Sequence, residues 1–259
     1  MTAPLAVVEL GRMDYASTHA LQRALCDRRI AGLLDRDVLL LVEHESTVTL
    51  GRGTRAESLP LAPEELRRRG LTVAEIERGG DVTWHGPGQL VGYPILDLTT
   101  HRPDLHWYLR QVEETLVRAL ARLGIPAERN PGLTGVWTGG RKIASIGIHV
   151  RRWVTTHGFA LNVVNDLAGF DLIVPCGIAG VEMTTVAREA VRRAVGRSGG
   201  PADGRTGGQA VSEPETGELW RATTAVVVEE FGQVFDRRPE PTELGAIVPE
   251  GTVSAQGAY

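Results

Sequence analysis

The sequence predicts one α/β (α+β) domain, and three observations support this class. Residues 38–42 form a continuous apolar run, which is typical of a strand buried on both faces. Residues 105–123 carry leucine and valine at helical spacing, which indicates an amphipathic helix. Residues 136–163 resemble antiparallel strands, with Gly139-Gly140 as one turn and Arg151-Arg152 near another.

The other predicted elements follow in chain order. Residues 6–10 form a strand, and Asp14 then caps a helix with Leu21, Leu25 and Ile30 at helical spacing. Further strands are expected at 48–50, 72–76 and 90–98, with a short helix at 63–69 and a helix at 219–235.

Two low-complexity segments set the predicted domain boundaries. Residues 196–217 consist mostly of Gly, Ser, Pro, Thr and charged residues, which predicts a disordered insertion. Helical spacing resumes after it, so the insertion interrupts a single catalytic domain at 1–238. Residues 239–259 have few large side chains and are predicted to form a flexible tail.

Composition excludes several classes of protein. The 259 residues are 42% hydrophobic, which is enough for a substantial core, but the apolar runs are far shorter than the roughly 20 residues of a membrane span. Without a signal-peptide pattern, we expect a cytoplasmic protein with no membrane partner. A net charge of -4 predicts no nucleic-acid partner. Cys26 and Cys176 lack CxxC spacing, which argues against a disulfide framework or a cysteine-based zinc site.

A glycine-rich segment, RGGDVTWHGPGQ at 78–89, is the first candidate functional element. Four glycines and a proline surround Arg78 and His85. Glycine lets a ligand approach the backbone closely, and the two polar side chains favour a binding role. The alternative is a tight double turn between strands.

Cys176 is the better candidate of the two cysteines for chemistry. Pro175 and Gly177 flank it and hold the thiol on a loop. A lone cysteine is more often a packing residue, and that alternative stays open. Cys26 lies within an ordinary amphipathic helix, which favours packing.

A cysteine nucleophile needs a nearby cation or base, since the free thiol is mostly protonated at neutral pH. Lys142 is the single lysine among 28 basic side chains, the other 27 being arginine. A lysine kept against this bias suggests a need for an amine that can gain or lose a proton. The alternative is a solvated turn lysine following Gly139-Gly140.

Four blocks together resemble the LipB family of octanoyltransferases. They are RGGDVTWHGPGQ at 78–89, KIASIG at 142–147, HGFALN at 157–162 and PCGI at 175–178, in the family's order and spacing. The resemblance implies the α/β fold shared by biotin and lipoate protein ligases, with a mixed sheet flanked by helices. The chain departs from the family in its insertion, in its tail and in lacking the proline that commonly follows the residue at His44.

The resemblance also implies residue roles. Cys176 would carry the acyl group as a thioester, and Lys142 would activate it and shuttle the proton. His44 and His157 resemble pocket or supporting residues, although either could equally be a hydrogen-bonded core histidine. The implied substrate-binding residues are Arg78, Gly79, Gly80, Asp81, Val82, Thr83, Trp84, His85, Ser145, Ile146, Gly147, Gly158, Phe159 and Ala160.

The implied reaction moves an octanoyl group from acyl carrier protein to a lysine of a lipoyl domain. The acceptors implied are the E2 subunits of 2-oxoacid dehydrogenases and the H protein of glycine cleavage. Thioester exchange followed by amide formation runs downhill, so we expect no ATP, metal or other cofactor beyond the donor's phosphopantetheine. Backbone N–H groups around Cys176 or in a turn at 145–147 are candidate oxyanion donors.

Three alternative functions remain at this level. One is an ATP-dependent lipoate or biotin ligase of the same fold, which would not need Cys176. Another is an acyl-binding or carrier-docking protein without catalysis. A thioesterase is less favoured, since water must be excluded for an amine to react.

Overall fold

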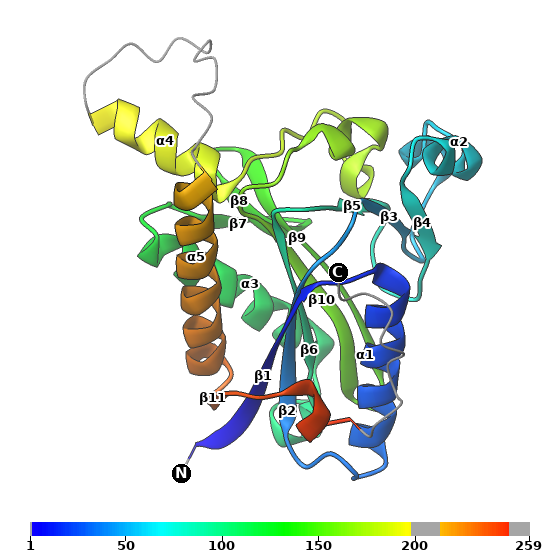
Figure 1. The fold of residues 1–259 in the computed structure, drawn as a ribbon, viewed down its shortest axis with the longest axis vertical. Coiled ribbons are helices and arrows are strands. Elements are labelled where there is room, and N and C mark those ends of the chain that lie inside the picture. The colour runs from blue at the N-terminus through cyan, green and yellow to red at the C-terminus, as the bar shows by residue number, and fades with distance from the viewer. Residues whose placement is uncertain (1, 198–212, 249–259) are drawn as a thin grey trace.

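The computed structural model describes residues 2–197 and 213–248, and its centre is an eight-stranded mixed sheet. The strand order is β11-β1-β2-β6-β10-β9-β8-β7, parallel among the first three strands and antiparallel beyond them. A second sheet has the order β4-β3-β5. This architecture confirms the predicted α/β class and the mixed sheet flanked by helices (Figure 1).

The elements of the two sheets and their helices have the following bounds. The strands are β1 (Ala3–Arg12), β2 (Asp37–Glu43), β3 (Thr47–Leu50), β4 (Thr72–Glu75), β5 (Thr83–His85), β6 (Gln89–Ile95), β7 (Glu128–Asn130), β8 (Leu133–Thr138), β9 (Arg141–Arg151), β10 (Val154–Asn162) and β11 (Arg237–Pro241). The α-helices are α1 (Tyr15–Ile30), α2 (Pro63–Arg68), α3 (Leu105–Arg122), α4 (Val186–Arg197) and α5 (Glu213–Val234). In the described ranges, no helix is both long and apolar enough to cross a bilayer.

Strand β2 shows how the large sheet is covered on both faces. Leu39 and Leu41 point to the core that α3 and α5 complete, whereas Val38, Leu40 and Val42 point to the core under α1. Figure 1 shows these helices on opposite faces of the sheet. Because successive side chains of a strand alternate, a strand covered on both sides has no polar face, which is why its sequence is continuously apolar.

Both predicted turns join antiparallel strands. Gly139 and Gly140 have φ values of 50° and 79° and connect β8 to β9, as a tight hairpin requires. The second turn lies one residue later than predicted, at Arg152 and Trp153, which also have positive φ values. Asp14 caps α1 as expected, accepting a hydrogen bond from the backbone N–H of Ser17.

The structure corrects the predicted edges of the insertion. Helix α4 continues to Arg197 and α5 starts at Glu213, so both ends of the range 196–217 are helical. Residues 198–212 lie outside the described residues. Pro214 is compatible with the new boundary because proline is tolerated in the first turn of a helix.

The prediction of a flexible tail from residue 239 is wrong as far as Val248. Strand β11 pairs in parallel with β1 at the edge of the sheet, and Ile247 and Val248 are buried in the core under α1. An edge strand tolerates the prolines of β11, which lack the N–H that a central strand needs. Residues 249–259 lie outside the described residues.

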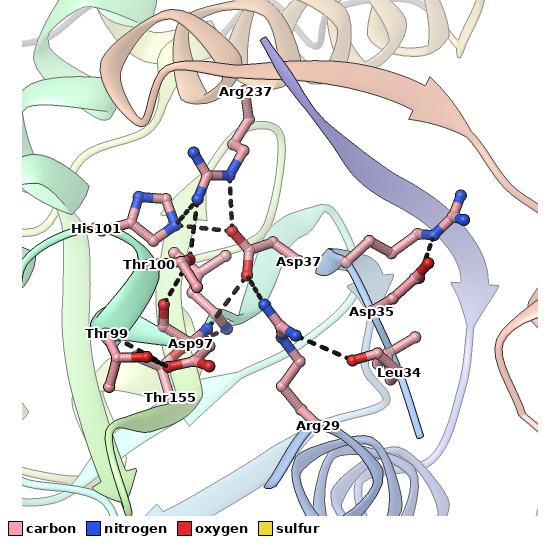
Figure 2. Close-up of polar contacts among 12 residues, drawn as sticks. Arg29, Leu34, Asp35, Asp37, Asp97, Thr99, Thr100, His101, Thr155 and Arg237 are labelled. Atoms are coloured by element: carbon pink, nitrogen blue, oxygen red, sulfur yellow. Dashed lines mark hydrogen bonds and ion pairs between the residues drawn. The ribbon is translucent and has the colours of Figure 1, made fainter. Parts of the chain in front are cut away.

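A buried ionic cluster fastens β11 to the sheet (Figure 2). Asp37, 2% exposed, accepts hydrogen bonds from Arg237 Nε at 2.9 Å, Arg29 Nη2 at 3.4 Å and the backbone N–H of Asp97 at 3.2 Å. The Nε2 atom of His101 lies 2.7 Å from the same carboxylate. The cluster joins α1, β2, the segment after β6 and β11.

Replacing Gly158 with alanine is expected to destabilise the centre of the sheet. A Cβ atom there would lie 2.2 Å from the carbonyl oxygen of Gly92 on β6, so the two strands would have to separate. Overpacking of this kind typically costs about 1–3 kcal/mol of unfolding free energy. Denaturant unfolding of Gly158→Ala measures the loss, and Gly245→Ala is the control, since a Cβ at Gly245 meets nothing within 4 Å.

Candidate active site

Lys142 and Cys176, 34 positions apart, meet at one end of the sheet. Lys142 lies on β9, and its Nζ atom is 3.0 Å from the Sγ atom of Cys176, on the 3-10 turn Pro175–Gly177. The lysine is 1% exposed, and the ring of Trp137 lies 5.5 Å from its Nζ. The two residues singled out separately in the sequence are thus in direct contact, and Lys142 is not a solvated turn residue.

The backbone of Cys176 adopts a conformation that is rare outside glycine. Its φ and ψ are 57° and 19°, in the left-handed region. Its N–H donates to the carbonyl oxygen of Val82 at 3.0 Å, and the N–H of Val174 donates to that of Ser58 at 2.9 Å. These bonds hold the loop in a strained shape, which typically costs about 1–3 kcal/mol and is found most often at functional sites.

Asp81 supports this loop from the glycine-rich segment. One carboxylate oxygen accepts from the Ser58 hydroxyl at 2.6 Å, and the other accepts from the N–H of Val82 at 2.7 Å. A Cβ on Gly177 would lie 2.5 Å from the Asp81 carboxylate. Only glycine therefore lets the loop after Cys176 approach the carboxylate this closely.

Cys176 opens on a cavity of about 210 Å³. Val91, Ile146 and Phe159 give it an apolar wall, and Arg78 and His85 contribute polar atoms. Most of the predicted substrate-binding residues line it, namely Arg78, Gly80, Asp81, Thr83, His85, Ser145, Ile146, Gly147, Gly158, Phe159 and Ala160, together with His157.

Four predicted residues do not line the cavity. Val82 and Trp84 pack in the small core under the second sheet, and Gly79 donates its N–H to the carbonyl oxygen of Ile148. His44 lies behind the wall, where its Nε2 accepts from the Tyr93 hydroxyl at 2.8 Å. The segment 145–147 is part of β9 and not a turn, since Gly147 pairs with Gly158 on β10.

Some cavity residues were not predicted from the sequence. Tyr15 directly follows the helix cap Asp14, and Val91 and Tyr93 occupy alternate positions of a predicted strand. Gln89 ends the glycine-rich segment and begins this strand. Because every second residue of a strand points to the same face, counting in twos from Gln89 could have identified Val91 and Tyr93. Ile178, the last residue of the PCGI block, also lines the cavity. Nothing in the sequence pattern marks Gly132, Leu133 or Thr134, which line it as well.

A hydrogen-bonded chain links three of the sequence blocks. His85 Nδ1 donates to Gln89 Oε1 at 2.8 Å, and Gln89 Nε2 donates to Asn162 Oδ1 at 2.9 Å. Asn162 then donates to the carbonyl oxygen of Thr184 at 3.1 Å, and the N–H of Thr184 donates to the carbonyl oxygen of Lys142. The glycine-rich segment and the HGFALN block therefore help to position the strand that carries Lys142.

Arg78 brings a buried positive charge to the cavity. It is 7% exposed, and its Nη2 donates to the carbonyl oxygen and to the hydroxyl of Thr49, at 2.8 and 2.9 Å. A fixed guanidinium of this kind can attract the carbonyl oxygen or another electron-rich group of a ligand.

His44 and His85 are neutral at physiological pH. Burial lowers the pKa of His44 to about 4 and that of His85 to about 3. His85 Nδ1 carries the proton because its partner, Gln89 Oε1, can only accept. His44 Nδ1 is protonated for the same reason, since it bonds to the carbonyl oxygen of Met13. Neither ring is therefore a reservoir of positive charge for the cavity.

These pKa values predict how stability depends on pH. The unfolded chain binds protons at both histidines below about pH 6.5, whereas the folded protein keeps them neutral down to about pH 4. The free energy of unfolding should therefore fall as the pH drops from 6.5 towards 4. Denaturant titrations across this range should show a smaller slope for His85→Gln. The exposed His106→Asn should match wild type, and an unchanged slope in His85→Gln would contradict the assignment.

Comparison with known proteins identifies the family of this chain. The model of the lipoyl protein ligase A/B catalytic domain matches residues 14–195. An octanoyltransferase of Synechococcus elongatus is 55% identical over 173 residues, which cover 67% of this chain and 73% of that protein. An octanoyltransferase of Geobacter sulfurreducens is 54% identical over 186 residues, covering 72% and 76%.

Solved structures show the same fold at low sequence identity. A lipoate-protein ligase A crystallised with ATP superimposes with a TM-score of 0.67 at 15% identity, covering 94% of this chain and 90% of that one. A putative lipoate protein ligase of T. acidophilum with bound lipoic acid gives 0.65 at 16% identity, covering 94% and 89%. The chain therefore belongs to the lipoyl protein ligase A/B family and, within it, to the octanoyltransferases.

Proposed function

We propose that this acyltransferase moves an octanoyl group from acyl carrier protein to a lysine of a lipoyl domain, through a thioester on Cys176. The donor presents the acyl group on phosphopantetheine. The acceptors in this proposal are the lipoyl domains of 2-oxoacid dehydrogenase E2 subunits and the H protein of glycine cleavage. The observation that carries the proposal is the 3.0 Å contact between Lys142 Nζ and Cys176 Sγ beside the cavity.

The contact supplies both a nucleophile and a route for the proton. The pair can exist as a neutral amine and a thiol or as an ammonium and a thiolate. The two states differ by the transfer of one proton between Cys176 Sγ and Lys142 Nζ, which lie 3.0 Å apart. In the charged state each group stabilises the other, because an ammonium inside a protein needs an anionic partner. The thiolate is the reactive form of cysteine.

The reaction then has two steps. In the first, the thiolate attacks the donor's carbonyl carbon, the new C–S bond forms, and the phosphopantetheine thiol leaves with a proton from the Lys142 ammonium. In the second, the acceptor amine attacks the Cys176 thioester, the enzyme's thiolate leaves, and neutral Lys142 takes the proton that the amine loses. Exchanging thioesters is nearly neutral in free energy and forming an amide is favourable, so the transfer needs no ATP.

The hydroxyl of Ser145 is the group that we assign to the oxyanion. The N–H groups of Cys176, Gly177 and Ile178 already donate within the protein, to Val82, Val174 and Pro175. Ser145 Oγ lies 3.9 Å from the sulfur and lines the cavity, close enough to reach an oxygen on the attacked carbon. Donors directed at the developing charge lower the barrier without having to reorganise.

A nucleotide-free transfer assay tests the function. Octanoyl-acyl carrier protein, a purified lipoyl domain and the enzyme are mixed without ATP, and intact mass spectrometry of the domain should show one added octanoyl group. A domain with its acceptor lysine changed to arginine is the control. Modification that requires ATP and free octanoate, and that survives Cys176→Ala, would instead support an ATP-dependent ligase.

A further inference from the structure

Two histidines and a glutamate gather beside the acyl cavity, apart from the Lys142–Cys176 pair. His19 lies on α1, Glu77 precedes Arg78, and His157 lies on β10. Glu77 Oε2 is 3.2 Å from His19 Nε2 and 4.0 Å from His157 Nε2. One ligand atom from each of the three residues lies within 4.8 Å of the other two.

His157 directs an unpartnered nitrogen into this group. The residue is 2% exposed, and its Nε2 has no hydrogen-bond partner among the described residues. A buried polar atom without a partner is costly, which makes such an atom informative. A neutral imidazole nitrogen that carries no proton can offer its lone pair to a metal ion. The Nε2 of His19, by contrast, already faces the Glu77 carboxylate at 3.2 Å.

We propose that His19, Glu77 and His157 bind one Zn²⁺ ion, with the fourth position left to water. Zinc is bound tetrahedrally by imidazole nitrogens and carboxylate oxygens at about 2.0–2.2 Å, which places ligand atoms about 3.4 Å apart. The separations from Glu77 to the two histidines, 3.2 and 4.0 Å, lie on either side of that value, and all three ligand atoms lie within 4.8 Å of one another. Binding therefore requires the side chains to close around the ion by up to about 1.4 Å.

The local charges suit a cation at this place. Glu77 supplies the negative charge, with its Oε2 atom 3.2 Å from His19 Nε2 and 4.0 Å from His157 Nε2. Arg78 is the opposing charge, and its guanidinium is bonded to Thr49 and Gly79. Glu77 therefore remains free to act as the anionic ligand.

The ion would act on the shape of the pocket and takes no part in the two proposed steps of the transfer. It would join α1 and the start of the glycine-rich segment to β10, whose residues Gly158, Phe159 and Ala160 line the cavity. The proposal does not depend on the Cys176 chemistry. It can therefore fail while the proposed function stands, and the reverse also holds.

Zinc binding to the full chain tests the proposal. The background carries Cys26→Ala and Cys176→Ala, because Cys26 shares a groove with Glu77 and thiols bind zinc. After treatment with a chelator, calorimetric titration with Zn²⁺ should give one ion per chain, and the melting temperature should rise with zinc concentration. Titration with Co²⁺ should give visible absorption bands without a thiolate charge-transfer band.

Single-ligand variants decide where the ion binds. His19→Asn and Glu77→Gln should each weaken binding by more than the 10- to 100-fold typical of losing an outer partner of a metal ligand. His157→Asn should do the same, and asparagine tolerates the positive φ of 56° at this position. His106→Asn and Glu75→Gln remove an exposed histidine and an exposed carboxylate, and they should leave affinity unchanged. Absence of binding, or equal affinity in the site and control variants, would overturn the proposal.

Discussion

Replacing Lys142 with methionine is expected to lower kcat for octanoyl transfer by about 10²- to 10⁴-fold, the usual contribution of a positioned acid or base. Methionine keeps the length and the apolar contacts of the side chain but removes its charge and its proton. Cys176 would then lose the group 3.0 Å away that favours its thiolate and protonates the leaving thiol. Single-turnover assays with octanoyl-acyl carrier protein measure both steps.

Lys142→Arg separates charge from proton transfer. A guanidinium stays protonated at any pH of the assay, so it can keep a thiolate but cannot relay a proton. We expect acylation of Cys176 to recover partly and transfer to the acceptor amine to remain slow. A loss of kcat in Lys142→Met supports the role of Lys142 only if the variant melts at the wild-type temperature. A wild-type kcat in this variant would remove Lys142 from the mechanism.

Replacing Asp37 with asparagine is expected to cost about 3–5 kcal/mol of unfolding free energy, the range measured when one partner of a buried ion pair is removed. Arg29 and Arg237 would lose their common anion inside the protein (Figure 2). Strand β11 should detach first, because Arg237 is its ionic anchor to the sheet. Denaturant unfolding gives the loss, and hydrogen exchange of β11 amides gives its location.

The same cluster predicts a dependence on acid. Burial raises the pKa of Asp37, but the hydrogen bonds and charges of His101 and Arg237 outweigh it and leave the pKa below its usual value. The stabilisation is therefore complete above about pH 4 and is lost as the pH falls through the lowered pKa. Asp37→Asn should lack this part of the acid transition. Asp35→Asn is the matched control, since Asp35 is exposed and pairs with Arg36. An equal loss of stability in both variants would contradict the role of the cluster.

The elements with a clear local pattern were predicted well. Strand β2 is a continuous apolar run and helix α3 has apolar residues at helical spacing, and both were located to within a residue or two. The glycine turn between β8 and β9 was also found, since two adjacent glycines with positive φ mark a tight hairpin. Local geometry determines all three, so a single sequence carries enough information.

Elements that depend on distant partners were missed. Strand β11 reads RRPEP, which has charges and prolines and no apolar alternation. Its order comes from pairing with β1 and from the contact of Arg237 with Asp37, 200 positions away in the chain. His19 and Glu77 were missed as a group for the same reason, because only the packing of α1 against β10 brings them to His157. The contact between Lys142 and Cys176 was foreseen because a thiol and a lone lysine have complementary chemistry.

Acylation of the enzyme itself tests the central claim most directly. The full chain is incubated with octanoyl-acyl carrier protein without an acceptor, and its intact mass is measured before and after hydroxylamine, which cleaves thioesters and spares amides. Because Lys142 is the chain's single lysine, an amide on another lysine side chain cannot confuse the result. We predict one hydroxylamine-sensitive octanoyl group on wild type and on Cys26→Ala, and none on Cys176→Ala. An acyl group that persists on Cys176→Ala would contradict the proposed thioester. So would a wild-type enzyme that carries no acyl group and yet octanoylates a lipoyl domain.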